Sequence, residues 1–206
     1  MKPRLWIITL LSLSAHLRLP AAEPAEFTVM LLGYCRAGST QTDPDAPGGF
    51  GTSDNLPKPL SASPAQKNLY LEIIDAGDAV FAEKYTGLRL RLVNGTQKTA
   101  ELSAADSRLS IVQEALDADG TWKDVEYLPR SWCGNSFHKV YLPVKHCWEF
   151  VAPKYSGPQK TKLRFRLSIS NHHTIYSPEY DGGIHPGQFT QQADRPATSL
   201  MDPYGR

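Results

Sequence analysis

The residues best suited to chemistry lie in one short stretch of the sequence. Cys133 is followed by Asn135 and His138. A basic partner favours the thiolate, which is the nucleophilic form of a cysteine, and Asn135 could orient the imidazole. No protease or transferase signature surrounds these residues, however. The sequence therefore predicts no catalytic residue and a protein that is not an enzyme.

A disulfide is the second chemistry that the cysteines allow. Cys133 and Cys147 are the obvious pair, since the chain has three cysteines and Cys35 lies far from the other two. If residues 144–145 form a two-residue turn, Leu142 lies opposite Cys147. The bridge then requires the loop after Cys133 to fold back across the hairpin. The alternative is that the two side chains are small buried hydrophobes.

The histidines and carboxylates do not predict a metal site. His172 and His173 are adjacent, and adjacent residues of a strand point to opposite faces. The sequence contains no zinc-ligand spacing. The segment 117–120, Asp-Ala-Asp-Gly, resembles the opening of a calcium loop, but Leu128 stands where such a loop needs a glutamate. We therefore expect no metal and no cofactor, and a hairpin turn at 117–120.

Surface recognition remains, because exposed aromatic rings stack on sugars or anchor protein interfaces. Trp148 alternates with Glu149 and is assigned to the core. Trp122 lies beside the expected hairpin turn, and Trp132 lies in a loop. The predicted ligand-binding residues are Trp122, Tyr127, Trp132, Asn135 and His138.

Strands must position these residues. The segments 88–92 and 163–169 alternate apolar side chains with mostly arginine ones, as half-buried strands do. The arginines form a basic stripe if the two strands share a sheet, and otherwise face solvent or acidic partners. Weaker strands are expected at 69–75, 80–84, 98–103, 109–116, 121–127, 139–142, 147–151 and 174–176. This spacing predicts an all-β fold, a single antiparallel β-sandwich, with a partly closed barrel as the alternative.

A family resemblance supports this architecture. The stretches ADSRLSIVQEALDADGTWKDVEYLPRSWCGNSFHKVYLP, TKLRFRL and IYSPEYDGGIHPGQF, within Ala105 to Phe189, resemble a group of uncharacterised exported bacterial proteins. The resemblance implies an immunoglobulin-like sandwich and export. It implies no reaction, because a fold does not by itself specify a function.

Composition divides the chain into four parts. A basic start followed by the apolar run Leu5–Leu13 predicts a signal peptide over 1–22, and the run is too short for a transmembrane span. Residues 23–67 are rich in Gly, Pro, Ser and Thr, which predicts a flexible, disordered N-terminal tether. The β-sandwich domain is expected over 68–185, followed by a C-terminal tail over 186–206.

Two local motifs leave alternatives open. Cys35 follows a second apolar stretch and could carry a lipid anchor, but Tyr34 stands where lipoprotein signals require a small residue. The triplet 94–96, Asn-Gly-Thr, matches the glycosylation pattern and also suits a turn, which we prefer.

Charge narrows the range of partners. With 22 basic and 21 acidic residues the net charge is +1, which excludes a strong field for nucleic acid. The sequence thus predicts a non-enzymatic interaction or structural module, secreted or held in the periplasm or cell envelope. Its partner would be a protein. Alternatively, the protein is a carbohydrate-binding module that stacks polysaccharide on exposed aromatics.

Overall fold

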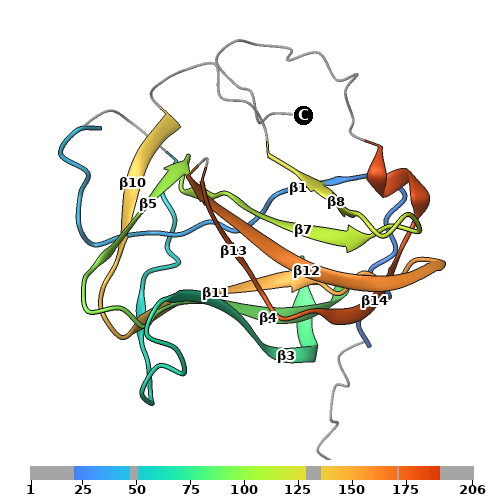
Figure 1. Ribbon diagram of the computed structural model, residues 1–206, viewed down its shortest axis with the longest axis horizontal. Helices are drawn as coiled ribbons and strands as arrows, with labels where there is room; N and C mark the ends of the chain where they lie inside the picture. The colour runs from blue at the N-terminus through green and yellow to red at the C-terminus, as the bar shows by residue number, and fades with distance from the viewer. Residues whose placement is uncertain (1–20, 47–50, 129–135, 171, 191–206) are drawn as a thin grey trace, which may run out of the picture.

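The computed structural model describes residues 21–46, 51–128, 136–170 and 172–190, and these ranges are almost entirely β-structure (Figure 1). Within them there is no α-helix, so no helix is long and apolar enough to cross a membrane. All but one of the strand pairings are antiparallel. The predicted all-β, antiparallel fold class is confirmed.

The strands form three main sheets and one parallel pair. The four-stranded sheet has the order β2 (Lys58–Pro59), β11 (His146–Pro153), β4 (Tyr85–Asn94) and β3 (Leu69–Phe81). The five-stranded sheet has the order β13 (His173–Tyr176), β12 (Gln159–Ser170), β7 (Ile111–Leu116) and β8 (Trp122–Asp124), with β14 (Tyr180–Ile184) also beside β12. The three-stranded sheet has the order β10 (Phe137–Leu142), β5 (Ala100–Ala105) and β6 (Arg108–Leu109). Finally, β1 (Leu31–Leu32) pairs with β9 (Glu126–Tyr127), and η2 (Pro186–Phe189) is a 3-10 helix.

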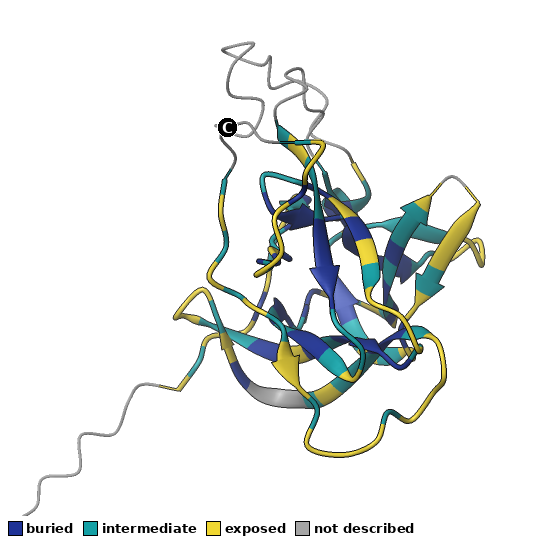
Figure 2. Ribbon diagram, turned by 90° about the vertical axis from the view of Figure 1, so that its left-hand side faces the viewer, coloured by how far each residue is buried: buried dark blue, intermediate teal, exposed yellow. Residues whose placement is uncertain are grey.

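One hydrophobic core joins the three sheets. The sheet containing β7 and β12 lies above the sheet containing β3 and β4 in Figure 1, and buried residues of both sheets belong to one hydrophobic cluster. Figure 2 marks the buried positions along the strands. Leu90 and Phe165 are both fully buried, which confirms the two alternating segments. Trp148 is also fully buried, as predicted. The immunoglobulin-like topology stays a prediction.

Several strands differ from those expected. β3 is one long strand where two were expected, and β14 was not predicted. The turn at 144–145 does form, since the His146 amide donates to the Pro143 carbonyl over 3.2 Å. Leu142, however, lies opposite Ala100 on β5, and β11 pairs with β4 instead. Alternation determines which face of a strand is buried, but not which strand is its partner.

Both predicted turns are present. Gly120 has a φ of +80° and donates its amide to the Asp117 carbonyl over 3.0 Å, which closes the hairpin between β7 and β8. The left-handed conformation explains why glycine stands there. At the glycosylation pattern, the Asn94 side chain is buried and donates to the carbonyls of Lys98 and Leu142, each over 2.8 Å. It is a turn-forming residue that lies out of reach of solvent.

The segment expected to be a tether belongs to the fold where it is described. Cys35 and Ala37 are buried in the main core, and the Trp148 indole donates to the Gly38 carbonyl over 2.9 Å. β2 adds two further residues to the edge of the four-stranded sheet. The described part of 23–67 is therefore docked on the sheets instead of extending away from them. Its few apolar residues suffice because the sheets provide the remainder of the buried surface.

The start of the predicted tail is docked as well. η2 lies against β8, and Phe189 packs on a second core cluster that contains Tyr155 and Leu163. The packed unit therefore extends beyond the expected limits of 68–185 at both ends.

Candidate functional site

The structure brings two of the five predicted ligand-binding residues together. Trp122 on β8 and Tyr127 on β9 are both partly exposed and line the same hollow. His138 lies elsewhere, on β10. Trp132 and Asn135 fall outside the described residues.

Only one cysteine of the predicted Cys133–Cys147 disulfide lies in the described part of the chain. Cys147 is a buried free thiol, 2% exposed, and Cys133 lies outside the described residues. Burial raises the pKa of the Cys147 thiol. It behaves as the small buried hydrophobe of the alternative interpretation. Cys35 is likewise a buried free thiol in the main core.

We call the hollow at β8 and β9 the β8–β9 pocket. It has a volume of about 570 Å³ and is open to solvent. Parts of the chain that are far apart in the sequence build it, including the docked N-terminal segment and η2. Its lining residues are Met30, Val112, Trp122, Lys123, Asp124, Glu126, Tyr127, Leu128, Arg166 and Phe189.

A cation stack holds the indole of Trp122. The Arg164 guanidinium carbon lies 4.0 Å from the centre of the Trp122 ring and 3.9 Å from that of Tyr176. Arg164 Nε also lies 2.9 Å from Glu114 Oε2, which fixes the guanidinium between the rings. Stacking of this kind is attractive because the face of an aromatic ring carries negative potential. The indole is therefore oriented before any ligand arrives.

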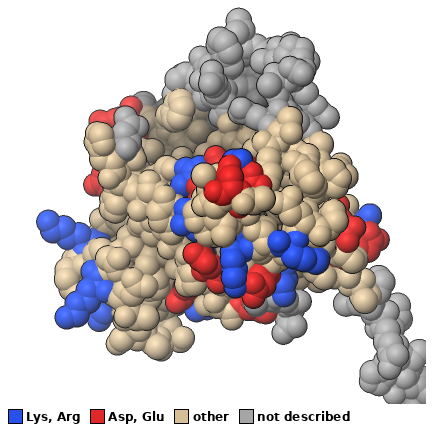
Figure 3. Space-filling view, turned by 45° about the vertical axis from the view of Figure 1, so that its right-hand side comes forward, with Lys and Arg blue, Asp and Glu red and all other residues tan. Residues whose placement is uncertain are grey.

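Three charged residues that line the pocket, Lys123, Asp124 and Arg166, are held in ion pairs. Arg166 Nε lies 2.6 Å from Glu114 Oε1, and Arg166 Nη2 lies 2.6 Å from Asp124 Oδ1. Lys123 Nζ binds Asp117 and lies 3.1 Å from Asp119 Oδ2. Figure 3 shows this mixing of signs on the face that it draws, where basic and acidic side chains lie next to one another.

The condition for a basic stripe is not met, because β4 and β12 lie in different sheets. Arg91 of β4 pairs with Glu149 over 2.7 Å, whereas Arg164 and Arg166 of β12 pair with Glu114. The alternative that the arginines face acidic partners is the correct one.

A buried polar network lies behind the pocket. Glu126 is 1% exposed, and its Oε1 accepts hydrogen bonds from the hydroxyls of Tyr34 (2.9 Å) and Tyr155 (2.8 Å) and from Gln113 Nε2 (3.0 Å). Its Oε2 accepts a hydrogen bond from the backbone amide of Gln113 over 2.9 Å. The Tyr180 hydroxyl donates to the side-chain Oε1 of Gln113. Burial raises the pKa of Glu126 to about 7, and these donors limit the rise.

A carboxyl with a pKa near 7 has the acidity that general acid–base catalysis needs. Both oxygens of Glu126, however, are occupied by donors from the protein, and the side chain is almost fully buried. Glu126 therefore has a structural role: its hydrogen bonds connect β9 to β7 and to the N-terminal segment.

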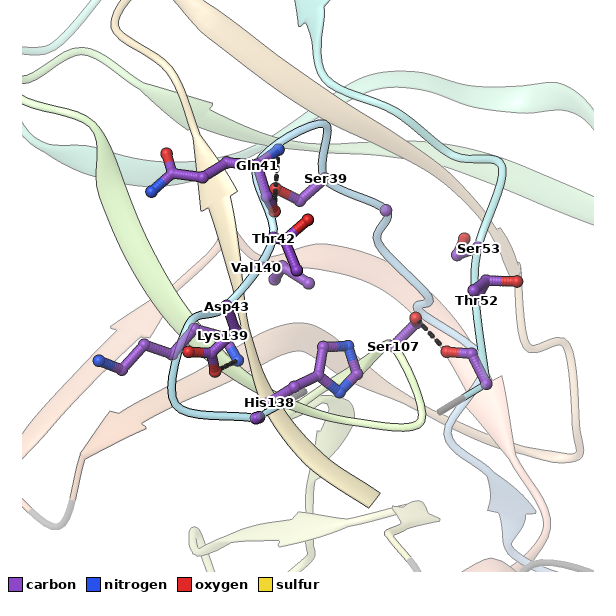
Figure 4. A pocket seen from close by; sticks show the side chains of 13 residues that line it. Ser39, Gln41, Thr42, Asp43, Thr52, Ser53, Ser107, His138, Lys139 and Val140 are labelled. Atoms are coloured by element: carbon purple, nitrogen blue, oxygen red, sulfur yellow. Dashed lines mark hydrogen bonds between the residues drawn. The ribbon is translucent and has the colours of Figure 1, made fainter. Parts of the chain in front are cut away.

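A second hollow, of about 410 Å³, lies between the docked segment and β10 (Figure 4). His138 lines it and points toward the space between Thr42 and Ser107. Two other polar groups in this hollow form hydrogen bonds within the protein. Asp43 accepts a hydrogen bond from the backbone amide of Lys139 over 2.7 Å, and the Ser107 hydroxyl donates to a backbone carbonyl. Because the hollow borders residues 47–50, which are outside the described part, we place no site there.

The described residues include no group of three or more His, Cys, Asp or Glu side chains that could hold a metal ion. Sequence analysis missed Met30 and Phe189 as walls of the pocket and Glu126 as a buried centre. For Glu126, the sequence showed only a glutamate near the end of a predicted strand, and a glutamate is usually expected at the surface.

Comparison with models of known protein families found no match. Comparisons with curated proteins and with solved structures found no significant match either.

Proposed function

We propose that the protein is a non-enzymatic binding module of the cell envelope or extracellular space, and that the β8–β9 pocket is its binding site. One observation carries this proposal: Trp122 and Tyr127, from two strands, line the same open pocket, and a cation stack already orients the indole. A pocket of about 570 Å³ has the size of typical ligand sites. The basic, apolar start of the chain and the resemblance to exported proteins support the location.

The arrangement favours binding over catalysis. The charged side chains that line the pocket are held in ion pairs, and the one lining carboxyl with a pKa near neutrality, Glu126, is enclosed by protein donors. A general acid or base must reach the proton that it transfers. Ordered aromatic and polar groups with this geometry are suited to holding a ligand.

The test is an NMR titration of the isotopically labelled full chain. Soluble envelope polysaccharide and envelope protein extract are added separately, and the backbone and indole shifts are followed. We expect shifts confined to Trp122, Tyr127 and their neighbours, and their loss in Tyr127→Ala. The control is Leu56→Ala, which shortens an apolar side chain that is 44% exposed in the N-terminal segment and does not line the pocket, and this variant should bind as the wild type does. Shifts centred elsewhere, or none with either fraction, would overturn the proposal.

A further inference from the structure

We propose that the β8–β9 pocket binds an uncharged oligosaccharide, because its walls are aromatic and its polar groups neutralise one another. This inference rests on the proposed function and names the ligand class of the same site. Three features of the described residues support it: the rings, the pairing of the charges, and the polar atoms that remain exposed.

The rings provide surfaces for a sugar. Trp122, Tyr127 and Phe189 line the pocket, and the C–H faces of a pyranose pack against aromatic rings. One face of the Trp122 indole is occupied by Arg164 at 4.0 Å, so the stack fixes the ring. Lys123 lies over the Phe189 ring, 5.7 Å from its centre, and connects η2 to β8. A ring that is already ordered loses little conformational entropy on binding.

The charges exclude an anionic ligand. Lys123 has two acidic partners, Asp117 and Asp119, and Arg166 has two, Glu114 and Asp124. An incoming carboxylate or phosphate would have to displace one of these partners, and at Lys123 it would be repelled by the Asp119 carboxylate, which is 54% exposed and lies 3.1 Å from Lys123 Nζ. The hydrogen bonds from Thr121 hold the pKa of Asp119 at about 2, so this negative charge persists at every physiological pH.

The polar atoms favour hydroxyl groups over an apolar ligand. The side chains of Lys123 and Asp124 are each 42% exposed despite their ion pairs. A carboxylate has lone pairs beyond those that one arginine uses, and an ammonium has three donors, so both can bind hydroxyls without breaking a pair. A lipid or an apolar peptide would cover these groups without satisfying them, which is unfavourable. A neutral polyhydroxylated ligand carries no charge to be repelled and has hydroxyl groups that can bind these exposed polar atoms.

The experiment measures affinities of the full chain for four hexasaccharide probes by calorimetry and NMR: the neutral cellohexaose and laminarihexaose, the anionic hexagalacturonate and the cationic chitosan hexamer. We expect a neutral probe to bind with shifts at Trp122 and Tyr127. Its affinity should hold when salt rises from about 20 mM to about 500 mM, because screening weakens only charged contacts. Trp122→Ala should weaken binding about tenfold or more, and Leu56→Ala should leave it unchanged.

A charge variant makes the test sharper. Asp124→Asn removes one of the two acidic partners of Arg166 while keeping the shape of the side chain. We expect this variant to bind hexagalacturonate more tightly than the wild type does. Thermal unfolding of each variant verifies that it is folded.

Three outcomes overturn the ligand class: tighter binding of hexagalacturonate or of the chitosan hexamer than of either neutral probe by the wild type, salt-sensitive binding of the neutral probe, or no binding of any probe. If the envelope fractions still shift Trp122 and Tyr127, the pocket remains the site and only the ligand class is wrong. If they do not, the proposed function itself is wrong.

Discussion

The hydroxyl of Tyr34 donates a hydrogen bond to the carboxyl of Glu126 over 2.9 Å. The two residues are far apart in the sequence, and the contact ties the N-terminal segment to the strand that carries Tyr127. The pocket and the docking of this segment therefore depend on the same buried group.

Removal of this hydroxyl should loosen the segment. Tyr34→Phe removes two hydrogen bonds: the one that the hydroxyl donates to Glu126 Oε1 and the one that it accepts from the side-chain Nε2 of Gln113. Because one buried hydrogen bond to the carboxyl group is lost while Glu126 keeps its other donors, we expect a loss of about 1–3 kcal/mol in the free energy of unfolding, measured by urea denaturation. Tyr176→Phe is the control, since that ring is 46% exposed, and its variant should stay within about 0.5 kcal/mol. Equal stabilities of the two variants would contradict the role of Tyr34.

Stability should fall as the pH rises toward and above neutrality. The pKa of Glu126 is raised to about 7 in the folded protein from an ordinary value of 4.5, so the folded state holds the proton more tightly than the unfolded state. This contribution is complete below pH 4.5 and is lost as the pH rises through 7. The total loss is on the order of 3 kcal/mol.

The measurement compares wild type with Glu126→Gln by urea denaturation at about pH 5, 6, 7 and 8. The amide does not titrate, so between about pH 5 and 8 the difference between the two free energies of unfolding should change by most of this amount. Parallel pH profiles for the two proteins would rule out Glu126 as the titrating group.

The cation stack should contribute to stability as well as to the site. Arg164→Met removes the guanidinium from between Trp122 and Tyr176, and Glu114 keeps only Arg166. We expect a loss of about 1–2 kcal/mol, seen by thermal unfolding, together with a changed indole emission.

The control for the stack is Arg89→Met, which removes an arginine whose side chain is 48% exposed and whose ion pair with Asp75 is long, at 3.8 Å. Its effect should stay below about 0.5 kcal/mol. If Arg164→Met is as mild as this control, the stack does not order the indole.

A chain that begins at residue 68 should fail to fold stably. Truncation removes Tyr34, Cys35 and Ala37 from the interior and leaves the Trp148 indole without its carbonyl partner. Burial of apolar groups contributes about 25 cal/mol per Å², so the loss of a covering segment is large. Circular dichroism and size-exclusion chromatography should show an unfolded or aggregated product. A chain that begins at residue 21 is the control and should behave as the full chain does, whereas a folded, monomeric 68–206 product would restore the domain limits expected from sequence.

Cys147 should be a thiol in the purified protein. Because it is 2% exposed and its pKa is raised by burial, alkylation in the native state should be slow. After unfolding without reductant, peptide mass spectrometry should find Cys147 fully alkylated. Alkylation that requires prior reduction would instead restore the Cys133–Cys147 disulfide.

The sequence by itself determined the class of structure and the face of each main strand. Leu88, Leu90 and Leu92 alternate with arginines. A hydrophobic period of two residues is typical of a strand with one buried face. Gly120 and Asn94 likewise mark turns through local conformational preference alone. Trp148 could be assigned to the core, and Trp122 to the surface, by the same local argument.

Only the tertiary structure decided which segments meet. Residues 23–67 have too few apolar side chains to predict a folded segment, yet Cys35 is buried there and Tyr34 is partly buried, because the sheets provide an interior for them. The partner of β10, the burial of Glu126 and the meeting of Met30 and Phe189 at one pocket depend on contacts across most of the chain. Local patterns determine conformation, but long-range pairing is decided by the free energy of the whole packed core, and a sequence pattern of a few residues contains no information about it.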